Sequence, residues 1–87
     1  MSKIIISERE YDVLELIAQG LTNKEIAEKL CVTVTTVTTH IHSIYSKSLI
    51  DYGAGSSVAR LRCALKFQNN EFEKKIYYGK NRNAKYI

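Results

Sequence analysis

The side chains best suited to recognising another molecule lie on a threonine-rich segment between Val34 and Ser46. Helical spacing places four of them on one face that carries no charge. Threonine hydroxyl and methyl groups and histidine ring nitrogens can contact base edges in the major groove of DNA, including the methyl group of thymine. Residue types alone leave open the alternative that this face is an ordinary solvated surface. The candidate base-reading residues are Thr35, Thr38, Thr39 and His42.

Two periodicities compete in this segment, because the eight residues from Val32 to Thr39 are all β-branched and such residues favour strands. A half-buried strand would bury alternate residues, but the alternate positions turn from valine to threonine halfway along. Helical spacing instead collects the apolar residues on a single face. We therefore predict a helix whose buried face consists of Val34, Val37, Ile41, Ile44 and Tyr45.

A shorter helix precedes this one. Thr22 and Glu25 have the spacing of a capping box, and Ile26, Ala27 and Leu30 follow as an apolar stripe. Only about three or four residues then separate the two helices, which is the turn length of a helix-turn-helix. Free amides and the dipole at a helix start attract phosphate groups. The candidate phosphate contacts are Thr22, Asn23, Lys24, Thr33, Thr36 and Lys47.

Two further helices are predicted to support this pair. The first starts at a capping box formed by Ser7 and Glu10 and ends near Gly20. The second follows a glycine-containing loop, with Ser56 or Ser57 as its cap. Its inward stripe is predicted to include Val58, Leu61 and Leu65.

A second apolar line remains on the last of these helices. Leftover apolar surface suggests a partner, and a two-fold dimer is the commonest arrangement. The alternative is that this line packs against the first helix. The candidate dimer-interface residues are Ala59, Cys63 and Phe67.

Many of these residues together resemble a known family, the LuxR/GerE-type helix-turn-helix DNA-binding domain, over roughly residues 4–67. The resemblance implies an all-α four-helix bundle whose second and third helices form the helix-turn-helix, here as a stand-alone domain. It also implies that the third helix reads DNA and that the fourth pairs two protomers. The residues that carry the resemblance are Ser7–Glu10, Val13–Ala27, Thr36–Val37, His40, Ile44 and Lys47.

The chain departs from that family pattern in two places. Many members have a basic residue directly after the Thr-Val pair and another four residues later, where this chain has Thr38 and His42. The link from Leu49 to Ser57 is also a few residues longer than usual. We therefore expect an unusual operator sequence and an altered dimer geometry.

The composition limits the other functions that the chain can have. Cys31 and Cys63 are predicted to be buried free thiols, and His40 and His42 have the wrong spacing for a shared metal ion. No glycine-rich phosphate loop, paired carboxylates or Cys-His spacing points to an enzyme. We expect no metal, no cofactor, no membrane span and a cytoplasmic location.

The charge divides the 87 residues into a helix-turn-helix domain at 1–67 and a basic C-terminal extension at 68–87. Of the net charge of +4, the extension supplies +3, from five Lys or Arg and two Asp or Glu. The extension is expected to form either a short fifth helix from Glu71 to Tyr78 or a flexible basic tail. Its basic residues can grip a phosphate backbone or a neighbouring protomer, or can belong to a frayed terminus.

These features predict a sequence-specific transcription regulator that binds double-stranded DNA as a homodimer, with half-sites about 10 base pairs apart. The alternative is a protein-binding module that inhibits or modulates another regulator or RNA polymerase. The near-neutral charge of residues 1–67 favours this alternative. Heparin retention and fluorescence anisotropy on random duplex DNA distinguish the two functions.

Overall fold

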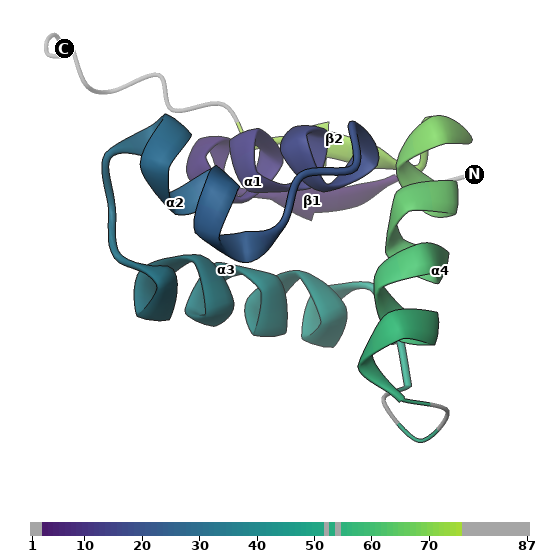
Figure 1. Cartoon of the computed structure of the whole chain (residues 1–87). Coiled ribbons are helices and arrows are strands. Elements are labelled where there is room, and N and C mark those ends of the chain that lie inside the picture. Colours follow the sequence, from purple (N-terminus) through teal and green to yellow (C-terminus); the bar gives the residue numbers. More distant parts are fainter. Residues whose placement is uncertain (1–2, 52, 54, 76–87) are drawn as a thin grey trace, which may run out of the picture.

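Four helices and two short strands form the fold. A computed structural model of the chain describes residues 3–51, 53 and 55–75. In Figure 1, α3 runs along one side of the molecule, α1 and the strand pair lie on the other side, and α4 crosses beside the end of α3. The mostly helical fold with a helix-turn-helix, α2 and α3, confirms the predicted fold class. In chain order the elements are β1 (Ile4–Ile6), α1 (Glu8–Ala18), α2 (Asn23–Leu30), α3 (Val34–Lys47), α4 (Ser56–Gln68) and β2 (Phe72–Lys74).

Local hydrogen bonds start the first three helices. The hydroxyls of Ser7 and Thr22 accept from the amides three residues on, and Glu10 and Glu25 accept from the cap amides, so both predicted capping boxes form. Thr33 caps α3 in the same way through its hydroxyl. The prediction for α4 is wrong, because its cap is Gly55, which has no side chain to offer, and both serines lie inside the helix.

Each of the four described helices ends in a Schellman motif, in which a left-handed residue donates its amide to the carbonyl three residues back. The next amide then donates to the carbonyl five residues back, at distances of 3.0–3.2 Å. Only one of the four left-handed residues is glycine, which adopts this conformation without strain. The left-handed residues are Gly20, Cys31, Leu49 and Asn70, with φ of 91°, 58°, 57° and 61°.

Leu49 is a left-handed position at which removal of the side chain costs little, because the side chain is 91% exposed and gains almost nothing from burial. We expect Leu49→Gly to raise the free energy of unfolding by about 0.5–1 kcal/mol, since relief of left-handed strain exceeds the entropy that glycine adds to the unfolded chain. Urea denaturation measures the change. The matched control is Arg62→Gly, at an exposed position inside α4, which should destabilise the protein. A destabilised Leu49→Gly variant would contradict this account.

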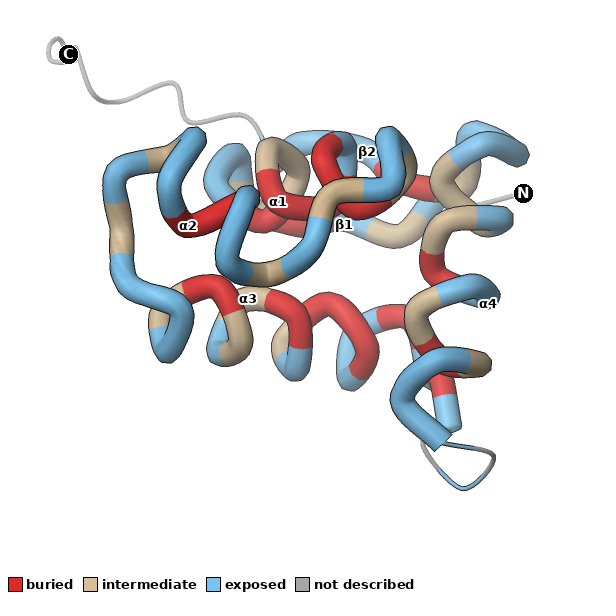
Figure 2. Tube along the Cα trace, viewed as in Figure 1, coloured by how far each residue is buried: buried red, intermediate tan, exposed pale blue. Residues whose placement is uncertain are grey.

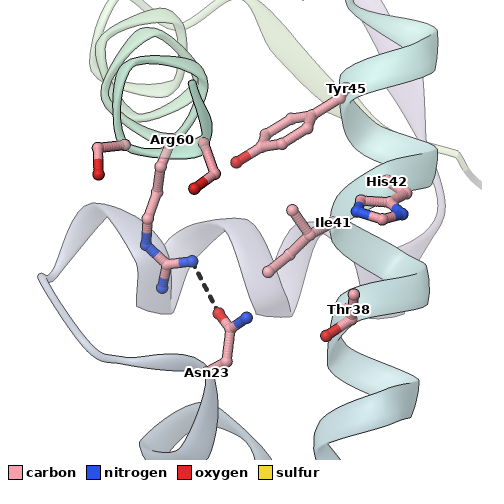
Figure 3. Close-up of a pocket in the computed structure, with 8 residues that line it drawn as sticks. Asn23, Thr38, Ile41, His42, Tyr45 and Arg60 are labelled. Atoms are coloured by element: carbon pink, nitrogen blue, oxygen red, sulfur yellow. Dashed lines mark hydrogen bonds between the residues drawn. The ribbon is translucent and has the colours of Figure 1, made fainter. Parts of the chain in front are cut away.

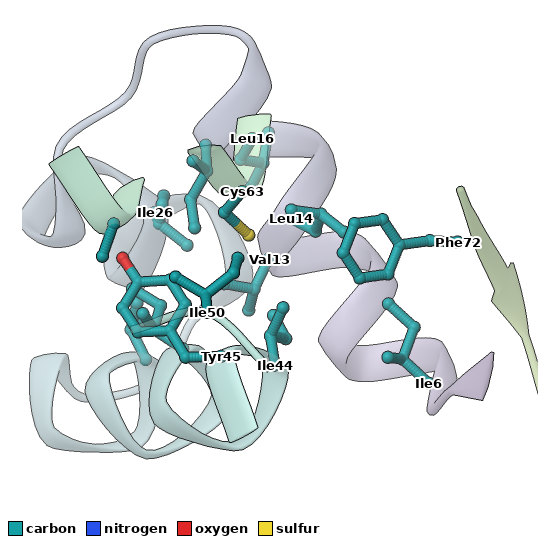
Figure 4. Close-up of a cluster of buried hydrophobic side chains, with 14 of the residues drawn as sticks. Ile6, Val13, Leu14, Leu16, Ile26, Ile44, Tyr45, Ile50, Cys63 and Phe72 are labelled. Atoms are coloured by element: carbon teal, nitrogen blue, oxygen red, sulfur yellow. The ribbon is translucent and has the colours of Figure 1, made fainter. Parts of the chain in front are cut away.

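The hydrophobic core lies between α3 on one side and α1, α2, α4 and the strand pair on the other (Figure 4). Val37, Ile41, Ile44 and Tyr45 of α3 are all buried in it, which confirms the helical periodicity predicted for this segment. Val34 was predicted to join them but is 46% exposed. It is the first residue of α3 and lies at the end of the buried face.

The segment after α4 is a strand where it is described, so the predicted helix from Glu71 to Tyr78 is wrong there. β2 pairs with β1 in parallel, with Phe72 opposite Ile4, and the side chain of Phe72 is buried against the core. Asn70 ends α4 before a further turn can form.

The fold thus continues past residue 67, the expected domain boundary. Residues 76–87, which hold the rest of the predicted basic tail, lie outside the described residues.

Most residues of the two apolar lines of α4 lie opposite to the predicted arrangement, although Val58 of the predicted inward stripe is half-buried. Ala59 and Cys63 are completely buried within the protomer, where α4 packs against α1, so they are not available to a partner. Their small side chains let the two helices approach closely. Phe67 is half-buried, with its ring edge-to-face with Tyr11 at 5.4 Å between centroids. The exposed apolar residues of α4 are instead Leu61 and Leu65.

The two cysteines differ in their surroundings. Burial raises the pKa of the Cys63 thiol from 9.0 to about 11, so this thiol stays protonated at neutral pH. Cys31 was also expected to be buried, but it is exposed at the left-handed end of α2. Both are free thiols.

Candidate nucleic-acid interface

The outer face of α3 is open along its length. Figure 2 shows buried residues on the side of α3 that faces the core and exposed residues on the opposite side. No described segment of the chain covers this outer face. Its residues are the predicted ones: Thr35, Thr39, His42 and Ser46 are exposed, and Thr38 is partly exposed.

Two threonines of this face use their hydroxyl hydrogens within the helix. Thr38 Oγ1 donates to the carbonyl oxygen of Val34, and Thr39 Oγ1 donates to that of Thr35, both at 3.0 Å. Such bonds to the carbonyl four residues back are common for threonine in helices. They fix the direction of each hydroxyl before any ligand arrives.

The start of α3 carries two of the predicted phosphate contacts. The hydroxyl of Thr33 accepts from the amide of Thr36 at 3.1 Å, and the two hydroxyl oxygens are 2.9 Å apart. One hydroxyl hydrogen therefore lies between the two oxygens and the other points away from the pair. This end of α3 can offer one hydroxyl donor and its first amides to an anion.

The start of α2 carries three more of the six predicted phosphate contacts. Thr22 lies in the capping box with Glu25, and Lys24 is exposed beside it. Asn23 is held by Arg60, which is not among the predicted contacts. The guanidinium of Arg60 in α4 donates to Asn23 Oδ1 and to the carbonyl of Leu21, each at 2.7 Å (Figure 3). Arg60 thus fixes the orientation of the start of α2.

A groove of about 180 Å³ lies where α2, α3 and the start of α4 meet. It brings together one predicted phosphate contact, Asn23, and two predicted base-reading residues, Thr38 and His42. Ser56 and Ser57, expected only as caps, also line it. Figure 3 shows the labelled side chains around this groove, with Arg60 and Asn23 on the side opposite α3. The groove joins the base-reading face to the start of α2.

Lys47, the sixth predicted phosphate contact, forms an ion pair with another residue of the same chain. Its ammonium donates to Glu10 Oε1 at 2.7 Å, and Ser43 donates to the other oxygen of the same carboxylate. Burial of Glu10 raises the pKa of its carboxyl, but the hydrogen bonds from Lys47, Ser43 and the Ser7 amide outweigh it and lower the pKa from 4.5 to about 2. Glu10 is therefore ionised at neutral pH and holds Lys47 to α1.

Comparison with known protein families identifies the family of this chain. Residues 5–48 match the family described as bacterial regulatory proteins, luxR family. This segment is just over half of the chain and runs from β1 to the residue that caps the end of α3. The chain belongs to the luxR family. It is therefore a DNA-binding helix-turn-helix domain of a regulatory family.

Individual luxR-family relatives agree with the family match. The transcriptional regulatory protein LiaR of Bacillus subtilis (strain 168) is 55% identical over 42 residues, which are 48% of this chain and 20% of LiaR. The oxygen regulatory protein NreC of Staphylococcus aureus (strain JH9) is 56% identical over 43 residues, which are 49% of this chain and 20% of NreC. The matched segment thus spans about a fifth of the length of these relatives.

All ten predicted base and phosphate contacts of this luxR-family domain lie within the matched segment. Arg60 lies beyond it, so the contact that holds Asn23 comes from a part of the chain that the family match does not cover. Within the described residues, no group of three or more His, Cys, Asp or Glu could hold a metal ion. None of the described helices is both long and apolar enough to span a membrane.

Proposed function

We propose that this luxR-family domain is a sequence-specific transcription regulator that inserts α3 into the major groove of DNA. The observation that carries the proposal is the open, uncharged outer face of α3. An α-helix fits the major groove, and base-edge contacts there supply sequence specificity. Thr35, Thr38, Thr39 and His42 are the proposed base-reading residues.

Phosphate contacts from the starts of α2 and α3 would position the domain. Thr22, Asn23 and Lys24 form one group and Thr33 and Thr36 the other. Lys47 is already paired with Glu10, and this pairing offsets its charge. Among the described residues few cations therefore face the duplex, and we expect their contacts to weaken only slowly with increasing salt.

The proposed functional unit is a homodimer formed through α4. Leu61 and Leu65 are 58% and 50% exposed, and Leu61 lines an apolar groove with Ile17 and Ala64. A second copy would cover these residues by the self-complementary contact of a two-fold dimer. The half-sites of the operator would then lie about 10 base pairs apart.

The first test is selection of bound duplexes from a random library at a stated salt concentration, which should enrich a palindrome. In the double variant Thr39→Ala and His42→Ala, we expect affinity for the selected duplex to fall at least about tenfold, because losing the base contacts of both side chains costs about 1–3 kcal/mol in total. Fluorescence anisotropy measures the affinity. Both side chains are exposed, so the fold should be unaffected.

The matched control is Gln68→Ala, which removes an exposed uncharged side chain at the end of α4. Its affinity for the selected duplex should equal that of the parent protein. Unchanged affinity in the double variant would refute the assignment of Thr39 and His42.

A second candidate function is binding to another regulator or to RNA polymerase. The neutralisation of Lys47 by Glu10 and the exposure of Leu61 favour it. Absence of binding to heparin and to random duplex DNA at low salt would support this function over DNA reading.

A further inference from the structure

Two side chains in the middle of the α3 face offer an incomplete set of hydrogen-bonding groups. A threonine hydroxyl has one hydrogen to donate and lone pairs that accept. In Thr38 and Thr39 that hydrogen is given to the main-chain carbonyls of Val34 and Thr35. What remains for a ligand is the γ-methyl group and the accepting side of the oxygen.

The base pairs differ in how well they match this pair of groups. Guanine presents two acceptors in the major groove, N7 and O6, which an accepting oxygen cannot satisfy. Cytosine presents an amino donor but no methyl group. An A·T pair presents both the adenine amino donor and the thymine methyl group, which match the threonine oxygen and the threonine methyl.

We propose that Thr38 and Thr39 recognise A·T pairs by apolar contact with the thymine methyl group, and that their hydroxyls do not act as donors to bases. The inference rests on the proposed function, because it requires α3 to lie in the major groove. It specifies the part of the operator that faces the centre of α3. Those base pairs are A·T, with thymine methyl groups directed at the two threonines.

Deoxyuridine substitution tests the methyl contact directly, because it removes only the thymine methyl group. The probes are duplexes selected from a random library, resynthesised with deoxyuridine in place of one thymidine at a time. We expect affinity to fall about fourfold at each thymidine that faces Thr38 or Thr39, the value for one buried methyl-sized group. Replacing such an A·T pair by G·C should weaken binding further. Putting 5-methylcytosine in that G·C pair should restore part of the loss.

Two variants of Thr39 separate the methyl group from the hydroxyl. Thr39→Val keeps a methyl group and removes the hydroxyl, and it should retain the discrimination between thymidine and deoxyuridine. Thr39→Ser keeps the hydroxyl and removes the methyl group, and it should abolish that discrimination at one position. The side chain is exposed, and valine and serine have helix propensities similar to that of threonine. The helix content measured by far-ultraviolet circular dichroism should therefore be unchanged.

The outcomes distinguish this inference from the proposed function. If no duplex binds at low salt, the proposed function itself fails. If a selected duplex binds with the same affinity after every deoxyuridine substitution, the protein reads DNA but the methyl inference is overturned. It is also overturned if Thr39→Ser preserves discrimination and Thr39→Val loses it, because the hydroxyl would then be the reading group.

Discussion

Phe72→Ala is expected to lower the free energy of unfolding by about 3–5 kcal/mol, the usual cost of removing a buried phenylalanine ring. Phe72 is only 3% exposed, although it belongs to a strand of three residues near the end of the described chain. Figure 4 shows its ring beside Leu14 and Ile6. For a domain of this size the loss corresponds to a fall in Tm of about 15 °C or more.

Glu73→Ala is the matched control for this prediction. Glu73 is the next residue of the same strand and pairs with Ile5, but its side chain is exposed. Its replacement keeps the backbone pairing and should change the stability by less than about 0.5 kcal/mol. Thermal unfolding followed by circular dichroism compares the two variants. If Phe72→Ala were as stable as the parent protein, packing of β2 against the core would not contribute to stability.

The stability of β2 also bears on DNA binding. β2 pairs with β1 and packs against α1, and β1 packs against α3. The strand pair therefore supports the core face of the helix whose outer face is proposed to read DNA. A chain shortened before Phe72 should lose cooperative unfolding and operator binding together.

Local signals in the sequence were sufficient to predict the helix-turn-helix. Each capping box joins residues three apart, as Ser7 to Glu10 and Thr22 to Glu25, so both partners are visible in a short window. The 3.6-residue period then placed Val37, Ile41 and Ile44 on the buried face of α3 despite their preference for strands. Burial of a whole face outweighs the weak propensity of single residues.

Long-range contacts carry the features that could not be predicted. Arg60 and Asn23 are 37 residues apart, and nothing near either residue indicates their bond. The partners Ile4 and Phe72 lie at opposite ends of the described chain, and a strand of three residues is too short to show a period. In α4 both lines of residues are apolar, so periodicity alone could not decide which one faces α1.

Glu10→Gln is expected to destabilise the protein at pH 7 by about 2–3 kcal/mol, because it removes a buried carboxylate that holds Lys47 and Ser43 of α3 to the start of α1. The Glu10 side chain is 6% exposed, whereas that of Lys47 is 44% exposed, and this partial solvation keeps the expected effect below the full value of the pKa shift. Glu15→Gln, which neutralises an exposed glutamate of the same helix, is the matched control and should be nearly neutral.

The pH dependence of this destabilisation follows from the lowered pKa of Glu10. In the unfolded chain the carboxyl has a pKa near 4.5, and in the folded protein it has a pKa of about 2. The ionised carboxylate therefore contributes its full stabilisation above pH 4.5, and the contribution is lost as the pH falls towards 2. The difference in unfolding free energy between the parent protein and Glu10→Gln should shrink across that interval. A difference that stays constant from pH 6 to pH 2 would contradict this account. It would mean that glutamine destabilises the protein by packing poorly, and that the charge of Glu10 does not hold α3 to α1.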